Sequence, residues 1–382
     1  MSVDQFSDVP DRLDSPELIK RASAAGYGVS ARMLETFRAQ GLLPRPIRTG
    51  HHGRAPVWIY PASADRQLIA LMAWREHTKD PDVLRVLLWV DGFPIPLAAI
   101  KTALAGALQT MLDLLDREIT KQAKQHGLDP DQSTDREHAL GLIASTLAAK
   151  RGPKALPRHA RVSAGQRTRA VELIMRGFAL GEPVTVTTEE AATVERVLGV
   201  SPNGRRDRVD GAGPWLTGPA EDLFDVAGIV AVPRALTAVL DATDAELETA
   251  RQMAAVLWRY LPLLARMLAA LFEEENYAGM SGLGRLDQQP EFVVILVPTI
   301  VAMLRAGWEQ NIQLIATGLA DLPTLAEQSQ RILGLPTSTV DANLAGKPAD
   351  VQTRARRLIL AALDGAFDYR PHESSKPRST TA

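Results

Sequence analysis

Apolar residues recur every three or four positions along most of this chain, which is the spacing of one face of an α-helix. Near the start, the pattern predicts a short helix that begins at about Pro16 and ends before Gly26. A second helix is predicted over Ala31–Gln40, because Ser30 is a favourable N-cap and Gly41 is a favourable residue after a helix end. We therefore expect two short helices joined by a glycine-containing turn.

Strand signals are few, and they concentrate in Ile47–Tyr60, where two β-prone arms flank a tip of Gly and His residues. This pattern predicts a β-hairpin, and the proline on each arm suits edge strands. Two further helices are predicted after the hairpin, over Ser63–His77 and from Pro81 to about Val90.

A longer apolar periodicity starts at Leu97 and predicts one helix of about seven turns that ends near Gly127. Its seam consists of apolar residues three or four positions apart: Leu97, Ile100, Leu104, Leu108, Met111, Leu115 and Ile119. Such a seam suits a coiled-coil partner, and it suits packing against its own chain equally well. Both alternatives are open at this stage.

A basic segment separates this helix from the rest of the chain. Lys150–Arg169 carries seven Lys or Arg and no acidic residue, which is typical of a linker at a domain boundary. Beyond it, helices are predicted over Thr188–Leu198, from a capping box at Thr243 to about Asn276, and over Asp350–Phe367. Phe292–Leu319 is almost continuously apolar and must be buried in a core, in a subunit interface or around an apolar ligand.

The composition excludes several classes of site. The chain has no cysteine, which excludes disulfides, thiolate metal sites, iron–sulfur clusters and cysteine nucleophiles. The seven histidines include no pair at the i, i+4 spacing of a helical metal site, and the chain has no G-x-S-x-G segment and no P-loop lysine. We therefore expect no metal, no cofactor and no enzymatic activity.

The hydropathy pattern gives an expectation for localisation. The chain opens with polar and acidic residues, and its longest charge-free apolar stretch, Phe292–Leu304, has 13 residues. A membrane span needs about 20 apolar residues. A cytoplasmic protein without membrane contact is expected.

Charge is distributed unevenly along the chain. The whole sequence has a formal net charge of −2, whereas Arg12–Tyr60 holds eight Lys or Arg against three acidic residues, a net charge of +5. Such an excess is typical of a module that faces phosphates. Two short helices around a glycine turn, followed by a basic hairpin, match a helix-turn-helix with a wing. Because these features agree, DNA binding is favoured over a solvated module that binds protein.

At these residues the chain resembles the MerR family of transcriptional regulators. The similarity is carried by residues 29–44, VSARMLETFRAQGLLP, followed by a basic wing that ends at Tyr60. Residues 91–100, DGFPIPLAAI, are similar to the family's turn into its dimerisation helix. The resemblance covers about residues 16–125. It implies a winged helix-turn-helix that dimerises through an antiparallel coiled coil and binds palindromic promoter DNA.

The resemblance also implies which side chains meet DNA. Those on or beside the second helix are Ser30, Arg32, Glu35, Thr36 and Arg38, and those leading into and along the wing are Arg45, Arg48, His51, His52 and Arg54. Family members often carry Arg at the position of Glu35 and Tyr at that of Thr36. Here a carboxylate would face the groove, where it could accept a hydrogen bond from a cytosine amino group or weaken phosphate binding.

Together these expectations describe a mainly α protein with an N-terminal winged helix-turn-helix, a long dimerisation helix and a separate all-helical C-terminal body. The expected order is a disordered start (1–15), the DNA-binding domain (16–95), the dimerisation helix (96–127), a helical segment with the basic linker (128–169), an effector or oligomerisation domain (170–368) and a disordered tail (369–382).

The main hypothesis is a sequence-specific regulator that binds double-stranded DNA as a homodimer or higher homo-oligomer, with an apolar small-molecule effector as a further partner of its C-terminal body. The alternative is an architectural or assembly protein whose helical body oligomerises and whose winged helix tethers it to DNA. A regulator should protect a discrete operator with two half-sites, whereas a tether should coat DNA with little sequence preference.

Overall fold

The computed structural model describes residues 13–52, 55–151, 162–198, 228–271 and 289–320, with short pieces at 284, 286, 342, 345–349, 351–353 and 355–357. The chain is mainly helical, as predicted, and the described residues contain one two-stranded sheet. It divides into two compact units, residues 1–103 with 370–382 and residues 104–369. This division falls within the long helix, whereas a boundary was predicted in Lys150–Arg169. The tail predicted to be disordered lies outside the described residues, as does the start up to residue 12.

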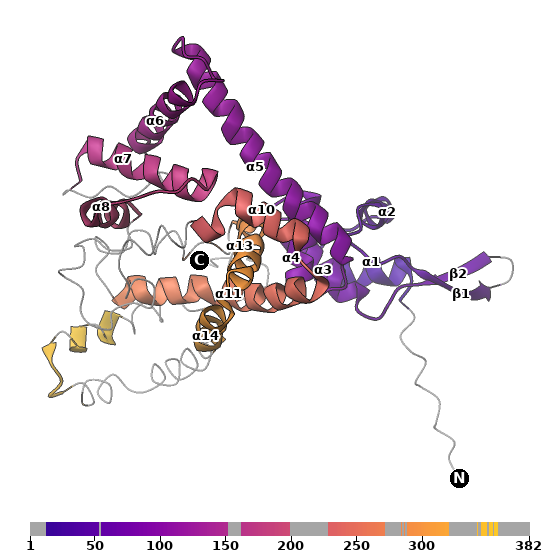
Figure 1. Cartoon of the computed structure of the whole chain (residues 1–382). Coiled ribbons are helices and arrows are strands. Elements are labelled where there is room, and N and C mark those ends of the chain that lie inside the picture. Colours follow the sequence, from indigo (N-terminus) through magenta and orange to yellow (C-terminus); the bar gives the residue numbers. More distant parts are fainter. Residues whose placement is uncertain are drawn as a thin grey trace, which may run out of the picture. The chain divides into compact units, whose positions relative to one another are not determined.

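The first unit contains four short helices and a hairpin before the long helix begins (Figure 1). In chain order the elements are α1 (Ser15–Ala24), α2 (Ala31–Ala39), β1 (Ile47–His52), β2 (Ala55–Ile59), α3 (Ala64–Trp74) and α4 (Pro81–Val90). All six were predicted from the sequence, with ends that differ by a few residues.

The two N-terminal helices are limited by their caps. Asp14 accepts a hydrogen bond from the Glu17 backbone N–H at 2.9 Å, and Ser30 Oγ accepts one from the Met33 N–H at 3.2 Å. After α2, Gly41 has a φ of +68°, a conformation that L side chains rarely adopt, so the helix cannot continue. Local sequence is therefore sufficient to set the length of α2.

The folded unit starts before the point predicted from sequence. Leu13 is 1% exposed, and its carbonyl accepts a hydrogen bond from the Tyr60 N–H at 2.8 Å. Asp14 caps α1, which begins at Ser15. Residues 13–15 were predicted as part of a disordered start, but they belong to the fold. Leu13 is held by the end of the hairpin, and Asp14 and Ser15 belong to the start of α1.

Long-range polar contacts join the helices of this unit over a core that includes Leu18, Leu34, Phe37, Leu68 and Leu84. Arg21 Nη1 of α1 lies 2.8 Å from Asp65 Oδ2 of α3. Gln67 Nε2 donates to the Leu42 carbonyl at 2.9 Å, and Arg85 Nη2 of α4 donates to the Gln40 carbonyl at 2.7 Å. The segment that ends α2 is therefore held by both α3 and α4.

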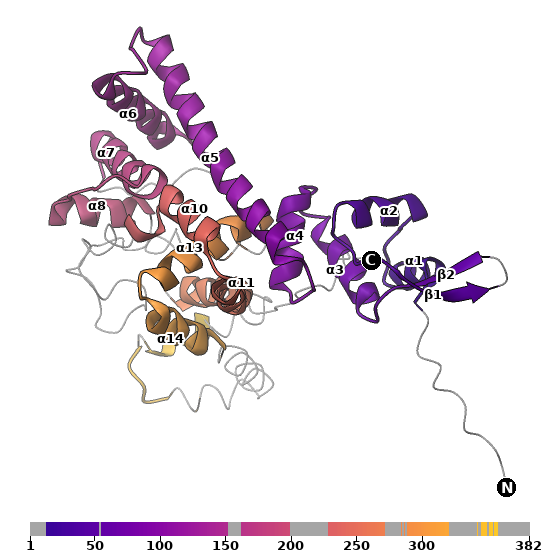
Figure 2. The same cartoon turned by 45° about the vertical axis from the view of Figure 1, so that its right-hand side comes forward.

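Strands β1 and β2 pair in antiparallel register, with Ile47 opposite Ile59 and Arg48 opposite Trp58. The register shifts between Arg48 and Gly50, which leaves a bulge in β1. Figures 1 and 2 show that the hairpin projects away from the helices of its own unit.

Helix α5 (Leu97–Gln125) has the predicted bounds. By length and composition, this one helix of the described residues could cross a membrane, and 22% of its apolar window is buried in the structure. In both views α6 (Ser133–Ala149) runs back along the end of α5 (Figures 1 and 2). There Ile119 and Ala123 pack against Leu140 and its neighbours on α6.

The predicted seam of α5 is largely covered by its own chain. Ile100, Leu104, Leu108 and Ile119 are each at most 2% exposed. The large apolar side chain that α5 leaves open is instead Leu114, which is 54% exposed and which the predicted seam did not include. Of the two alternatives for the seam, packing within the chain therefore accounts for most of it.

The rest of the second unit, as far as the structure describes it, is helical. Its described elements are α7 (Ala164–Ile174), the π-helical turn η1 (Met175–Leu180), α8 (Thr188–Leu198), α10 (Val232–Asp241), α11 (Asp244–Leu271), the 3-10 turn η5 (Pro290–Phe292), α13 (Val293–Arg305) and α14 (Glu309–Ala320). Helices α6, α7 and α8 share one apolar core, and α11 packs against α13 and α14. Helix α10 was not predicted from the sequence, and of the helix predicted over Asp350–Phe367 only small parts are described.

The apolar segment Phe292–Leu319 is two helices rather than one. Gly307 has a φ of +84°, which ends α13 and redirects the chain into α14. Val297 and Ile300 are at most 1% exposed, and Trp258 of α11 stacks on Phe292 with ring centroids 6.5 Å apart. These side chains form a core, one of the three burials that the sequence left open.

The capping box predicted at the start of α11 is present. Thr243 Oγ1 accepts from the Glu246 N–H at 3.2 Å, and the Glu246 carboxylate accepts from the Thr243 N–H at 2.6 Å. The pKa of Glu246 is lowered from 4.5 to about 2. The largest cause is this hydrogen bond from the Thr243 N–H, and the next is a hydrogen bond from Arg305 Nε at 3.0 Å. The charged carboxylate thus ties α11 to the end of α13.

We expect Glu246→Gln to lower the free energy of unfolding by about 1–2 kcal/mol at pH 7, since the carboxylate is 31% exposed and solvent screens its ion pair. Because the folded-state pKa is depressed, this stabilisation is present above pH 4.5 and is lost as the pH falls towards 2. Urea unfolding at pH 7 and pH 3 measures it, with Glu309→Gln, at the exposed start of α14, as the control. A difference that does not shrink at pH 3 would contradict the linkage.

Candidate nucleic-acid interface

One face of α2 is buried and the opposite face is polar and exposed. Leu34 and Phe37 are each 1% exposed and point into the core of the unit. Arg32, Glu35 and Thr36 are exposed, and their spacing places them together on the other side of the helix. The structure thus brings together three of the five side chains predicted to meet DNA on or beside this helix, whereas Arg38, another of the five, is half-buried.

Contacts from other elements fix the position of α2. Arg75 directly follows α3, and its guanidinium lies 4.8 Å from the centroid of the Phe37 ring. At the end of α2, the Gln40 carbonyl accepts from Arg85 of α4. A rigid support of this kind lets exposed side chains meet a ligand without a large loss of conformational entropy.

The polar side chains of α2 differ in how they are engaged. The Ser30 hydroxyl caps the helix, and the Thr36 hydroxyl donates to the Arg32 carbonyl at 3.0 Å. Glu35 is 71% exposed at its side chain and lies 3.9 Å from Arg38 Nη2, which is a long ion pair. Ser30 therefore has a structural task, whereas Arg32 and Glu35 extend from the helix.

The hairpin carries the remaining predicted residues. Arg45 before β1 and Arg48 within it are exposed. The backbones of His51 and His52 lie in β1 opposite Pro56 and Ala55, while their side chains lie outside what the structure describes, as does all of Arg54.

Two apolar side chains of the hairpin are unexpectedly open to solvent. Ile47 is 62% exposed and Trp58 is 49% exposed. Trp58 lies opposite Arg48 in the register, so the two side chains share one face of the ribbon. These residues were missed from the sequence, where they appeared only as β-formers. The available signal was that apolar residues on both faces of an isolated two-stranded ribbon cannot all be buried.

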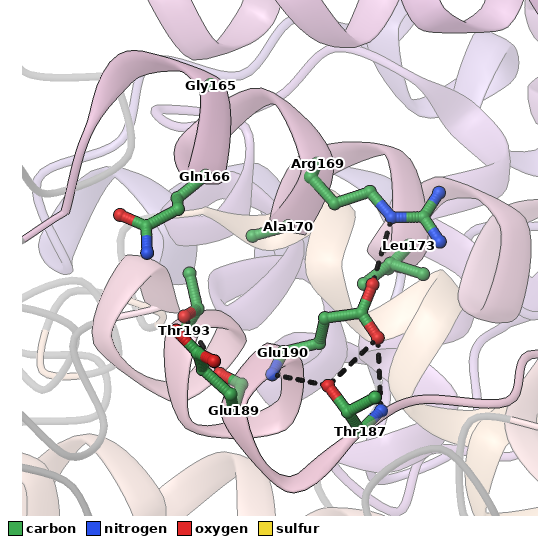
Figure 3. A pocket seen from close by; sticks show the side chains of 9 residues that line it. All are labelled: Gly165, Gln166, Arg169, Ala170, Leu173, Thr187, Glu189, Glu190 and Thr193. Carbon is green, nitrogen blue, oxygen red and sulfur yellow. Dashed lines mark hydrogen bonds and ion pairs between the residues drawn. The ribbon is translucent and has the colours of Figure 1, made fainter.

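The second unit holds a pocket of about 310 Å³ between α7 and α8, which Figure 3 shows from close by. Arg169 Nε donates to Glu190 Oε1 at 3.1 Å, and Glu190 Oε2 accepts from the Thr187 N–H at 3.0 Å and from its hydroxyl at 3.2 Å. The hydrogen bond from the Thr187 N–H is the largest cause that lowers the pKa of Glu190, and the hydrogen bond from Arg169 adds to it. Together they outweigh desolvation, which raises the pKa. The charges of Arg169 and Glu190 are paired with each other. We therefore assign to this network the structural role of joining α7 to α8, and not ligand binding.

Within the described residues, no group of three His, Asp or Glu is arranged to hold a metal ion. Comparison of the chain with protein-family models, curated proteins and solved structures yields no match in any of the three.

Proposed function

We propose that this protein is a sequence-specific, double-stranded-DNA-binding transcriptional regulator of MerR-like type that acts as a homodimer. The observation that carries the proposal is the exposed polar face of α2, supported by α3 and α4 and carried in the same unit as a projecting basic hairpin. In this proposal α1 and α2 form the helix-turn-helix, and β1 with β2 forms the wing. The second unit senses a ligand or contributes to oligomerisation.

The proposed contacts divide into base readout and phosphate binding. Arg32 and Thr36 reach base edges, because they lie on the exposed face of a helix narrow enough to enter the major groove. Arg48 of β1 holds a phosphate, and so does Arg54, which lies outside the described residues. Glu35 favours a cytosine amino group and disfavours contact with phosphate.

The proposed dimer uses the open part of α5. Leu114 is 54% exposed, and the neighbouring Met111 and Leu112 are only partly buried. An exposed apolar turn on a long helix loses unfavourable contact with water when a second apolar helix covers it. We assign that helix to a second copy of this chain, because the proposed DNA site has two half-sites.

Footprinting of the full-length protein on genomic fragments, at moderate salt and with competitor DNA, tests the proposal. A protected inverted repeat is expected. Weak protection without sequence preference would favour the architectural alternative, in which the first unit only tethers a helical assembly. Absence of binding would overturn the assignment of α2 and the hairpin to DNA.

Arg48→Ala should weaken binding to all DNA sequences alike and lower the slope of log Kobs against log salt by about 1 in magnitude, because one phosphate contact and its released counterion are lost. Fluorescence anisotropy at four salt concentrations measures the slope. Arg234→Ala removes an exposed cation of α10 and should leave it unchanged. If both variants keep the wild-type slope, Arg48 does not contact phosphate.

A further inference from the structure

An exposed tryptophan lies on the hairpin of the first unit. Trp58 of β2 is 49% exposed, and it lies directly opposite Arg48 of β1, which is also exposed. Side chains of directly opposed residues stand on the same face of an antiparallel ribbon, where their Cα atoms are about 4.5–5.5 Å apart. The hairpin therefore presents a large apolar surface and a cation side by side.

The fold fixes the position of this pair. The register of β1 shifts only after Arg48, so the pair belongs to the regular ladder at the end of the hairpin that joins the helices. Two residues after Trp58, the Tyr60 side chain is 3% exposed, and the Tyr60 N–H donates to the Leu13 carbonyl at 2.8 Å. A residue this close to a fixed point loses little conformational entropy when its side chain meets a partner.

The charge of the hairpin favours a polyanionic partner. Arg45 and Arg48 are exposed, and the sequence of residues 44–60 contains no acidic residue. A strand of duplex DNA alternates anionic phosphates with the apolar carbons of deoxyribose, and successive phosphates rise by about 3.4 Å along the helix axis. A guanidinium beside an aromatic ring, one strand spacing apart, matches this alternation of charge and apolar surface.

We propose that Trp58 packs against a deoxyribose of the DNA backbone, next to the phosphate that Arg48 binds. The contact takes no part in base readout, because every nucleotide presents the same sugar. This inference rests on the proposed function, and it adds an apolar contact that strengthens binding to all DNA sequences without adding charge.

An apolar contact predicts a salt dependence that a phosphate contact does not. Loss of Trp58 leaves the number of released counterions unchanged, so the slope of log Kobs against log salt stays constant. Trp58→Ala is therefore expected to weaken binding at least about tenfold at every salt concentration, with the slope of the wild type. Trp58→Phe keeps an aromatic face and should stay within about threefold of the wild-type affinity.

Fluorescence anisotropy of the full-length protein at four salt concentrations measures affinity and slope. The DNA is a duplex with one half-site of the footprinted operator and, for comparison, a duplex without it. A half-site binds one protomer, so contacts between copies do not contribute. Ile47→Ala is the matched control, because Ile47 is 62% exposed on the face of the ribbon opposite to that of Arg48, and its loss should change binding less than about twofold. Circular dichroism verifies that each variant is folded.

The outcomes separate this inference from the proposed function. If the wild type binds DNA and Trp58→Ala binds equally well, the sugar contact is overturned and the proposed function stands; if the wild type does not bind, both are overturned. A lower salt slope in Trp58→Ala, or equal losses in Trp58→Ala and Ile47→Ala, would assign the effect to a displaced phosphate contact or to an altered hairpin. Loss of self-association in sedimentation velocity, with unchanged half-site affinity, would assign Trp58 to a contact between copies.

Discussion

Leu114→Glu is expected to convert the proposed dimer into a monomer and to weaken binding to the proposed two-half-site DNA by at least about 100-fold. A carboxylate at this position would be buried without a partner in the proposed interface, and an unpaired buried charge costs several kcal/mol. Loss of the dimer removes the linkage that makes binding to the second half-site intramolecular. Leu114 is 54% exposed within one chain, so the folded monomer should tolerate the change.

Sedimentation velocity measures the oligomeric state, and anisotropy with intact and half-site DNA measures affinity. Leu314→Glu is the matched control, because this leucine of α14 is 76% exposed and lies outside the proposed interface. A Leu114→Glu protein that remains dimeric would exclude this turn of α5 as the interface. A wild-type protein that is monomeric on DNA would exclude the homodimer altogether.

Arg32→Ala is expected to weaken binding to the operator by about 5- to 150-fold, the range of one lost bidentate contact to a base, and to relax preference at one base pair of each half-site. Binding to non-specific DNA should fall far less, because only one charge is removed. The expectation follows from the position of Arg32 on the exposed face of α2, opposite the buried Leu34 and Phe37.

A library of operators with every base substituted in turn, titrated with wild type and variant, measures both affinity and preference. Lys20→Ala is the comparison, since Lys20 is 78% exposed on α1 and its removal should weaken all sites equally and by only a few-fold. An unaltered preference profile for Arg32→Ala would place Arg32 on the backbone or away from DNA.

The first unit was predictable because its signals are local. The cap at Ser30 and the left-handed Gly41 act within a few residues, and they set the length of α2. The 3.6-residue periodicity indicated the helices, and two β-prone arms around a tip of Gly and His residues indicated the hairpin between them. Helical spacing predicts that Arg32, Glu35, Thr36 and Arg38 point away from the inward stripe of α2. The structure confirms this for the first three, which are exposed, whereas the Arg38 side chain is only 27% exposed.

The exposure of Trp58 could not be predicted from local sequence signals. A β-propensity argument identifies the strand but cannot tell whether a second layer covers it. The described residues contain one sheet of two strands, so Trp58 and Ile47 remain open. Among the described residues of this unit no element covers these two side chains, and that tertiary property distinguishes them from core residues.

By itself, the sequence determined the mainly helical class, the bounds of α5, the capping box at Thr243 and the polar face of α2, because each depends on hydrogen bonds or periodicity within about one helical turn. The tertiary structure decided which side chains are covered. Leu114 is open although it lies beside a covered seam, and Arg167 is buried although Arg169 is exposed in the same basic segment. Burial depends on partners from distant parts of the chain, such as the Ala148 carbonyl nineteen residues before Arg167, and no local pattern encodes those partners.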